Sequence, residues 1–72
     1  MISKDEWLET FSANLQRIMN DRGISQRELA DAAGISEAAV SRYINKRQVP
    51  NGNTIVIMAK VLKCKTADLI GV

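Results

Sequence analysis

Residues 26–45 read QRELADAAGISEAAVSRYIN, and this stretch decides the fold. Just before it, Ser25 stands three residues ahead of Glu28, the spacing of a capping box that starts a helix. Apolar residues then recur at helical spacing until Gly34, a residue type that commonly ends a helix. Ser36 follows two residues later and can cap a second helix. A connection of about three residues forces the two helices to cross steeply.

The residue types inside this stretch suit such a crossing. Ala30 is small, so the second helix of the pair can pass close over the first. Gly34 can adopt a left-handed backbone that costs other residues about 1–2 kcal/mol. Ile35, Val40 and Tyr43 are placed to fill the angle between the two helices.

Before this pair, the sequence predicts one long helical segment from about Lys4 to Arg22. Ser3 and Glu6 have capping-box spacing at its start, and apolar residues recur along it at helical spacing. The pattern fits one long helix or two pieces that break near residues 10–12.

After the pair, two more helices are expected. A fourth helix follows a cap at Asn53 or Thr54 and continues to about Leu62. A short fifth helix follows a cap at Thr66 and ends near Ile70. The prediction is therefore an all-α, compact five-helix domain.

Composition excludes most enzyme chemistry. The chain has 72 residues, of which 46% are hydrophobic and 25% charged, which predicts one globular domain over residues 1–72. It has no histidine and one cysteine, Cys64, so no disulfide within the chain, Ser–His pair or ordinary zinc site can form. We expect no catalytic residues, no metal, no cofactor and no small-molecule ligand. Cys64 is expected to be a small, partly buried filler, with a redox role as the alternative.

Charge is distributed unevenly along the chain. Residues 1–36 carry a net charge of −2 and residues 37–72 a net charge of +4. Within the second half, Arg42, Lys46 and Arg47 fall close together, which is the kind of basic stripe that binds a polyanion, although charge alone favours the other explanation. The alternative is an ordinary solvated face. The polar, acidic start and the lack of a long apolar run predict no signal peptide, no membrane span and a cytoplasmic location.

The helix over residues 37–45 has two contrasting faces. At about 100° per residue, Ala39, Val40 and Tyr43 lie on one side, and the other side is polar with mostly short side chains. A face of this kind can approach the floor of a DNA major groove. The alternative is an amphipathic surface helix without a partner.

Taken together, these residues resemble the helix-turn-helix of the phage repressor and Cro-like family of DNA-binding regulators. The resemblance includes S-Q-R-E-L-A at 25–30, G-I-S at 34–36, Pro50 after a basic loop, and I-V-I-M-A-K-V-L-K at 55–63. It extends over about residues 12–70 and implies a lambda-repressor-like fold, with residues 1–11 as an N-terminal helical extension. It also implies a sequence-specific transcriptional regulator of double-stranded DNA, a repressor that binds a palindromic operator as a homodimer.

The resemblance assigns base reading to the start of the helix at 37–45. Arg42 would read guanine, Ser41 could bond to several bases, and Ala38 could contact a thymine methyl. Glu37 could accept a hydrogen bond from cytosine, or it could instead stabilise the positive N-terminus of its own helix.

Phosphate contacts are assigned on both sides of this helix. Gln26 opens its helix and would meet a phosphate there, and Arg27 would do so unless it pairs with Asp31. The remaining candidates follow the recognition helix and would clamp the backbone: Asn45, Lys46 and Arg47.

The resemblance implies dimer contacts around the start of the fourth helix and the loop before the fifth. Ile55, Met58, Ala59 and Leu62 form one stripe, which Val56 and Ile57 cannot both join. Val56 and Ile57 therefore meet the first or fifth helix, or they contact a second subunit, for which Val56 is favoured.

One departure from the family and one rival function remain. Family members often link the first helix to the end of the third by a charged pair, where this chain has Met19 and Ile44. The rival is an antitoxin-like module whose helical domain mainly binds a protein partner.

Overall fold

The computed structural model describes residues 2–71, so Met1 and Val72, the ends of the predicted domain, lie outside it. Over these residues the chain forms five α-helices and no strand, which confirms the all-α prediction. The helices are α1 Lys4–Arg22, α2 Gln26–Ala33, α3 Glu37–Ile44, α4 Gly52–Leu62 and α5 Thr66–Ile70.

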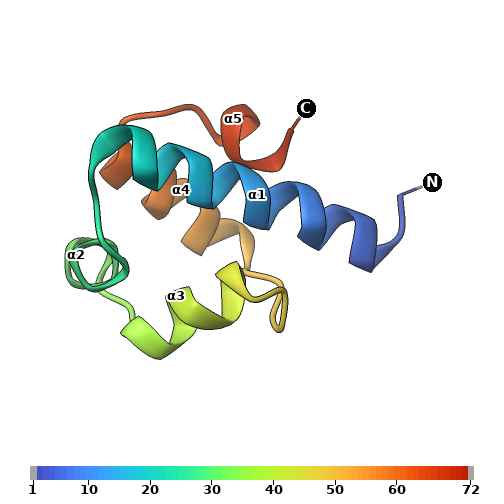
Figure 1. Ribbon diagram of the computed structural model, residues 1–72, viewed down its shortest axis with the longest axis horizontal. Coiled ribbons are helices and arrows are strands. Elements are labelled where there is room, and N and C mark those ends of the chain that lie inside the picture. Colours follow the sequence, from blue (N-terminus) through green and yellow to red (C-terminus); the bar gives the residue numbers. More distant parts are fainter. Residues whose placement is uncertain (1, 72) are drawn as a thin grey trace.

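The first helix is continuous, and α3, α4 and α5 all pack against it. It does not break near residues 10–12, which settles the alternative that the sequence left open. Leu8, Phe11 and Leu15 are buried along it, and the ring of Trp7 stacks on that of Phe11 with centroids 5.1 Å apart. In Figure 1, α1 spans most of the molecule, with α5 on one side of it and α2 and α3 on the other.

The steep crossing of α2 and α3 follows from the turn between them. Gly34 ends α2 in the left-handed conformation at φ 70°, and the backbone N–H of Ile35 donates to the carbonyl of Ala30 at 3.0 Å. The Ser36 hydroxyl then caps α3 by accepting from the backbone N–H of Ala39 at 3.0 Å. Figure 1 shows α2 almost end-on and α3 nearly lengthwise, so the predicted crossing is confirmed.

Two predicted helix caps were wrong. The cap of α4 is Asn51, not Asn53 or Thr54, because the Asn51 side chain already accepts from the backbone N–H of Thr54 at 2.8 Å. The cap position of α5 is Lys65, not Thr66, which is the first helical residue. Here the Asp68 carboxylate supplies the cap by accepting from the backbone N–H of Lys65 at 3.0 Å. Both helices therefore begin one to three residues earlier than expected.

Buried side chains from all five helices form one core. Tyr43 of α3 meets Phe11 of α1 edge-on, with ring centroids 6.4 Å apart. The fully buried large side chains are Phe11, Leu15, Leu29, Val40, Met58, Leu62 and Leu69. Because every helix contributes to it, this core fixes how the helices sit relative to one another.

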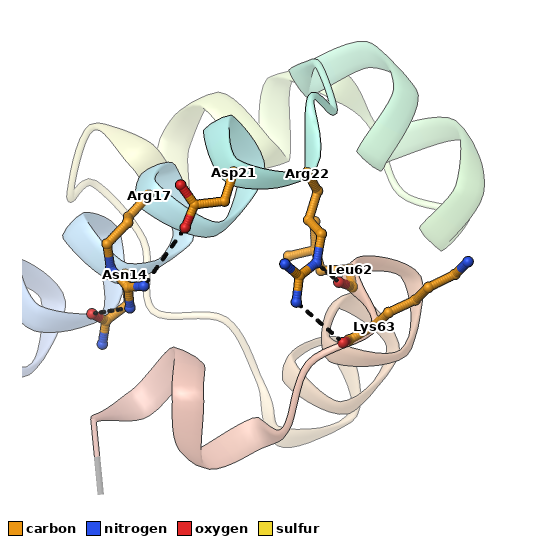
Figure 2. Close-up of polar contacts among 6 residues, drawn as sticks. All are labelled: Asn14, Arg17, Asp21, Arg22, Leu62 and Lys63. Carbon is orange, nitrogen blue, oxygen red and sulfur yellow. Dashed lines mark hydrogen bonds and ion pairs between the residues drawn. The ribbon is translucent and has the colours of Figure 1, made fainter.

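Polar side chains of α1 bond to the ends of three other helices. The hydroxyl of Ser12, a buried residue, donates to the carbonyl of Ile44 at the end of α3. Asn14 donates from its amide to the carbonyl of Leu69 in α5 at 3.0 Å. Arg22 donates from Nε to the carbonyl of Leu62 at the end of α4 at 3.0 Å (Figure 2). These carbonyls lie in last turns, where no residue of the same helix can satisfy them.

We expect Ser12→Ala to lower the free energy of unfolding by about 1–3 kcal/mol, because it leaves the partly buried Ile44 carbonyl without this donor. Chemical denaturation followed by circular dichroism measures this change. The control is Ala13→Ser at the neighbouring exposed position of α1, which measures the difference in helix propensity between the two residue types. A Ser12→Ala protein as stable as the parent would show that this hydrogen bond contributes nothing.

Candidate nucleic-acid interface

The third helix presents the face that the sequence predicts. Ala39, Val40 and Tyr43 are buried, while Glu37, Ala38 and Arg42 are exposed and Ser41 is partly exposed. The burial of one side leaves the other side free of the core. The structure therefore brings the four candidate base-reading residues onto one accessible face of α3: Glu37, Ala38, Ser41 and Arg42.

The end of this face has its own hydrogen bonds. Asn45 donates from its amide to the carbonyl of Ser41 at 2.9 Å and to the Ser41 hydroxyl at 3.2 Å. Asn45, a predicted phosphate contact, is exposed, and in this structure its amide N–H groups donate to Ser41. The Ser41 hydroxyl accepts from Asn45 and keeps its own hydrogen for a base acceptor.

The loop after α3 turns back toward the helix. Lys46 adopts the left-handed conformation at φ 62°, and the backbone N–H of Arg47 donates to the carbonyl of Arg42 at 2.8 Å. The loop then returns to the core at Pro50, which is buried. As a result, the exposed side chains of Lys46 and Arg47 follow directly on the exposed face of α3.

Two side chains of this region have partners within the protein. Lys46 Nζ lies 3.7 Å from a carboxylate oxygen of Glu9 on α1, and both side chains are at least half exposed. Arg42 donates from Nε to the Gln48 side-chain oxygen at 2.7 Å. Neither Glu9 nor Gln48 has a spacing in the sequence that marks it as part of the site. An exposed ion pair contributes little, so a phosphate can displace Glu9 from Lys46.

The start of α2 carries the other phosphate candidates. Gln26 is its first residue and is half-buried, while Arg27 is exposed. Among residues 2–71, Arg27 forms no ion pair with Asp31, so that predicted alternative is not realised. The first N–H groups of a helix lack partners within it and favour an anion.

The Ser25 capping box fixes where this helix begins. The backbone N–H of Ser25 donates to Glu28 at 3.0 Å, and the backbone N–H of Glu28 donates to the Ser25 hydroxyl at 3.1 Å. Hydrogen bonds from the Ser25 backbone and then its side chain lower the pKa of Glu28 below its ordinary value. The carboxylate form of Glu28 is therefore the one that caps α2.

A surface hollow of about 280 Å³ lies between α1, the start of α2 and the end of α3. It is lined by Gln26 of α2, Ile44 of α3 and Met19 and Gln16 of α1, among others. Met19 and Ile44, the two residues at which the chain departs from the resembling family, thus border the same hollow. A polar link from α1 to the end of α3 comes from Ser12, which no spacing in the sequence marks.

The apolar residues of α4 divide into a buried set and an exposed set. Met58, Ala59 and Leu62 are buried and Ile55 is half-buried, whereas Val56 and Ile57 remain 42% and 40% exposed. Val56 and Ile57 are therefore not buried against α1 or α5. Val49, just before α4, is also 41% exposed.

Residues 2–71 give little support to a redox thiol, a metal site or a membrane span. Cys64 is half-buried, and burial, with a further contribution from the Asp68 carboxylate, raises the pKa of its thiol. The filler interpretation fits this thiol better than a redox role, which needs a lowered pKa. Between Ile2 and Gly71, no three Cys, Asp or Glu side chains are grouped to hold a metal. Over the same range, no helix combines the length and apolar character needed to cross a membrane.

A comparison with known protein families shows which family has this arrangement of helices. A helix-turn-helix family matches residues 15–69, from the middle of α1 into α5. The chain belongs to the helix-turn-helix family. It is accordingly a DNA-binding transcriptional regulator.

Solved structures show the same fold. A hypothetical transcription factor, NHTF from Neisseria, is 24% identical, with 97% of this chain and 80% of that chain covered and a TM-score of 0.87. The SOS-response transcriptional repressor LexA from Eubacterium rectale is 23% identical, with 96% and 73% covered and a TM-score of 0.85. At these identities the likeness establishes the fold alone. No curated protein matches the sequence.

Proposed function

We propose that this helix-turn-helix protein is a sequence-specific repressor that binds a palindromic operator in double-stranded DNA as a homodimer. In this proposal α3 lies in the major groove, and residues 1–72 act as one domain with 1–11 as a helical extension. The protein acts in the cytoplasm, with no catalytic step and no cofactor. Each subunit reads one half of the operator.

The observation that carries the proposal is the exposed face of α3. Its outward side chains are short except for Glu37 and Arg42, so the helix backbone can approach the base edges closely. Arg42 donates to guanine O6 and N7, Ser41 bonds to a neighbouring base, and Ala38 contacts a thymine methyl. Glu37, the first residue of α3, accepts from cytosine N4 or stabilises its own helix start.

Groups on both sides of this face hold the phosphates. Gln26 and Arg27 lie at the start of α2, where the free backbone N–H groups favour an anion. Asn45, Lys46 and Arg47 continue from the end of α3. These contacts set the register of α3 in the groove and do not themselves read sequence.

The exposed apolar residues in the middle of α4 form the subunit contact. Val56 and Ile57 project from a helix whose other apolar residues already fill the core. Desolvating them against a second copy is favourable and needs no new polar partners. Val56 is the central contact of this interface.

The sign of regulation follows from occupancy. A bound dimer covers its operator and so excludes other proteins from that DNA, which is the simplest action for a regulator of this size. One of the solved structures named above is itself described as a transcriptional repressor. A main role in binding a protein partner, as in an antitoxin, is the competing function that the experiments below distinguish.

Selection of bound sequences from a random pool of duplex DNA tests the proposal directly. The parent protein is expected to select one palindrome, whereas Arg42→Ala relaxes one base position per half-site and costs about 1–3 kcal/mol on the preferred site. Lys65→Ala is the control, since Lys65 precedes α5, on the other side of α1 from α3 (Figure 1). A pool that yields no enriched sequence would favour the protein-binding role.

Salt dependence tests the phosphate contacts. Affinity should fall by orders of magnitude between about 50 and 200 mM salt, as it does for proteins that make 6–10 phosphate contacts. Lys46→Ala should weaken all sequences alike and reduce the slope of log affinity against log salt by about one unit. Lys65→Ala again serves as the matched loss of one positive charge and should leave the slope unchanged. A Lys46→Ala slope equal to that of the parent would remove Lys46 from the interface.

Assembly is tested at the apolar contact on α4. Two recognition helices related by a two-fold axis should lie about 34–36 Å apart and read half-sites centred 10 or 11 base pairs apart. Val56→Lys should abolish cooperative binding to the palindrome and leave weak half-site binding and the fold intact, as measured by gel shift and circular dichroism. Thr66→Lys adds the same charge on α5 and should change neither. Full-site binding by Val56→Lys as tight as the parent's would disprove this contact.

A further inference from the structure

Gln48 is held against the side chain most suited to reading a base. Arg42 Nε donates to the Gln48 side-chain oxygen at 2.7 Å, although both side chains are exposed. This hydrogen bond is charge-assisted, which makes it stronger than one between neutral groups. It also joins two different elements, because Arg42 lies in α3 and Gln48 lies in the loop beyond its end.

The backbone places Gln48 beside Arg42. Lys46 reverses the chain in a left-handed conformation at φ 62°, and the N–H of Arg47 returns to the carbonyl of Arg42 at 2.8 Å. Pro50 then anchors the loop in the protein interior. The Gln48 Cα is therefore fixed on both sides, so its side chain needs to order only its own torsions to reach Arg42.

The hydrogen bond uses one edge of the guanidinium and leaves another free. A guanidinium has five N–H donors in one plane, and Gln48 takes the single donor on Nε. The donors on the two Nη atoms remain available, and they can address guanine O6 and N7 end-on. An arginine already held in place loses less conformational freedom when it binds, which strengthens binding to the matching base.

We propose that Gln48 is a positioning residue that holds Arg42 in the orientation for reading guanine and so helps to determine operator specificity. This inference rests on the proposed function, because it requires that α3 enters the major groove. Gln48 acts through Arg42 and reads no base of its own. Its contribution should therefore appear in discrimination between bases and disappear when Arg42 is absent.

The experiment measures a discrimination ratio at fixed salt. The ratio compares affinity for the selected operator with affinity for the same operator after the guanine at the Arg42 position is replaced. Arg42→Ala should lower this ratio about 5- to 150-fold, the effect of losing one bidentate arginine–guanine contact. Gln48→Ala should lower it roughly 2- to 12-fold, the cost of ordering one long side chain on binding.

Three further variants separate positioning from other roles. Gln48→Glu keeps the acceptor oxygen, so it should preserve the ratio while its negative charge weakens binding to all sequences. Arg47→Ala, at the neighbouring position, should weaken all sequences and leave the ratio unchanged. The double variant Arg42→Ala/Gln48→Ala should have the same ratio as Arg42→Ala alone.

Each contrary result has a distinct meaning. If Gln48→Ala leaves the ratio unchanged while Arg42→Ala lowers it, the positioning role is wrong and the proposed function stands. The positioning role also fails if Gln48→Glu loses the ratio, or if Gln48→Ala lowers it further in the Arg42→Ala protein. If Arg42→Ala changes the discrimination between bases at no position of the operator, the base-reading role of Arg42 fails together with this inference. Thermal unfolding of each variant verifies that the exposed substitutions leave the fold intact.

Discussion

The free carbonyl groups at the ends of short helices are the constraint on which this structure depends. Helices of five to eleven residues have last turns that form a large part of their length, and those carbonyls lack partners within the helix. In this protein α1 supplies the missing donors: Ser12 for α3, Arg22 for α4 and Asn14 for α5. Figure 2 shows the second of these contacts, where the guanidinium reaches across to the end of α4. One long helix therefore holds the ends of the three shorter helices, and so the position of α3, the proposed recognition helix.

A second constraint acts at the other end of α3. Gly34 lets the chain turn within three residues, so the start of α3 is fixed relative to α2 while Ser12 fixes its end relative to α1. A helix held at both ends keeps its outward face in a constant orientation. This rigidity matters for a DNA reader because base contacts depend on side chains held in the right geometry by their supporting elements. The same reasoning extends to single side chains, since the loop that follows α3 orders Gln48, which in turn meets Arg42.

The sequence predicted the elements and the faces of this fold better than its tertiary contacts. Capping residues and helical spacing depend only on neighbouring residues, so α1, α2 and α3 and the buried side of α3 were correct. The start of α4 was wrong because Asn51, Asn53 and Thr54 can all cap a helix, and the sequence does not say which one the loop presents. Ser12 was missed because its partner, Ile44, lies 32 residues away in the sequence. Gln48 was missed because it meets Arg42 only after the loop turns back toward α3. The DNA-contact and dimer-contact residues remain predictions, supported by their exposure.

On the proposed function, the low net charge of this protein means that specificity would rest on a few positioned contacts. Its net charge is only +2, and acidic groups stand close to the proposed interface: Glu37 opens α3, and Glu9 pairs with Lys46. Each of these carboxylates opposes the general attraction to phosphate that supplies nonspecific binding. In the proposed complex, a weak general attraction would keep the protein from being held on arbitrary DNA, but it would also leave a single subunit with little affinity. Two subunits joined through the proposed apolar contact would recover that affinity only where both α3 helices find their bases, so the proposal couples the patch at Val56 to the face of α3.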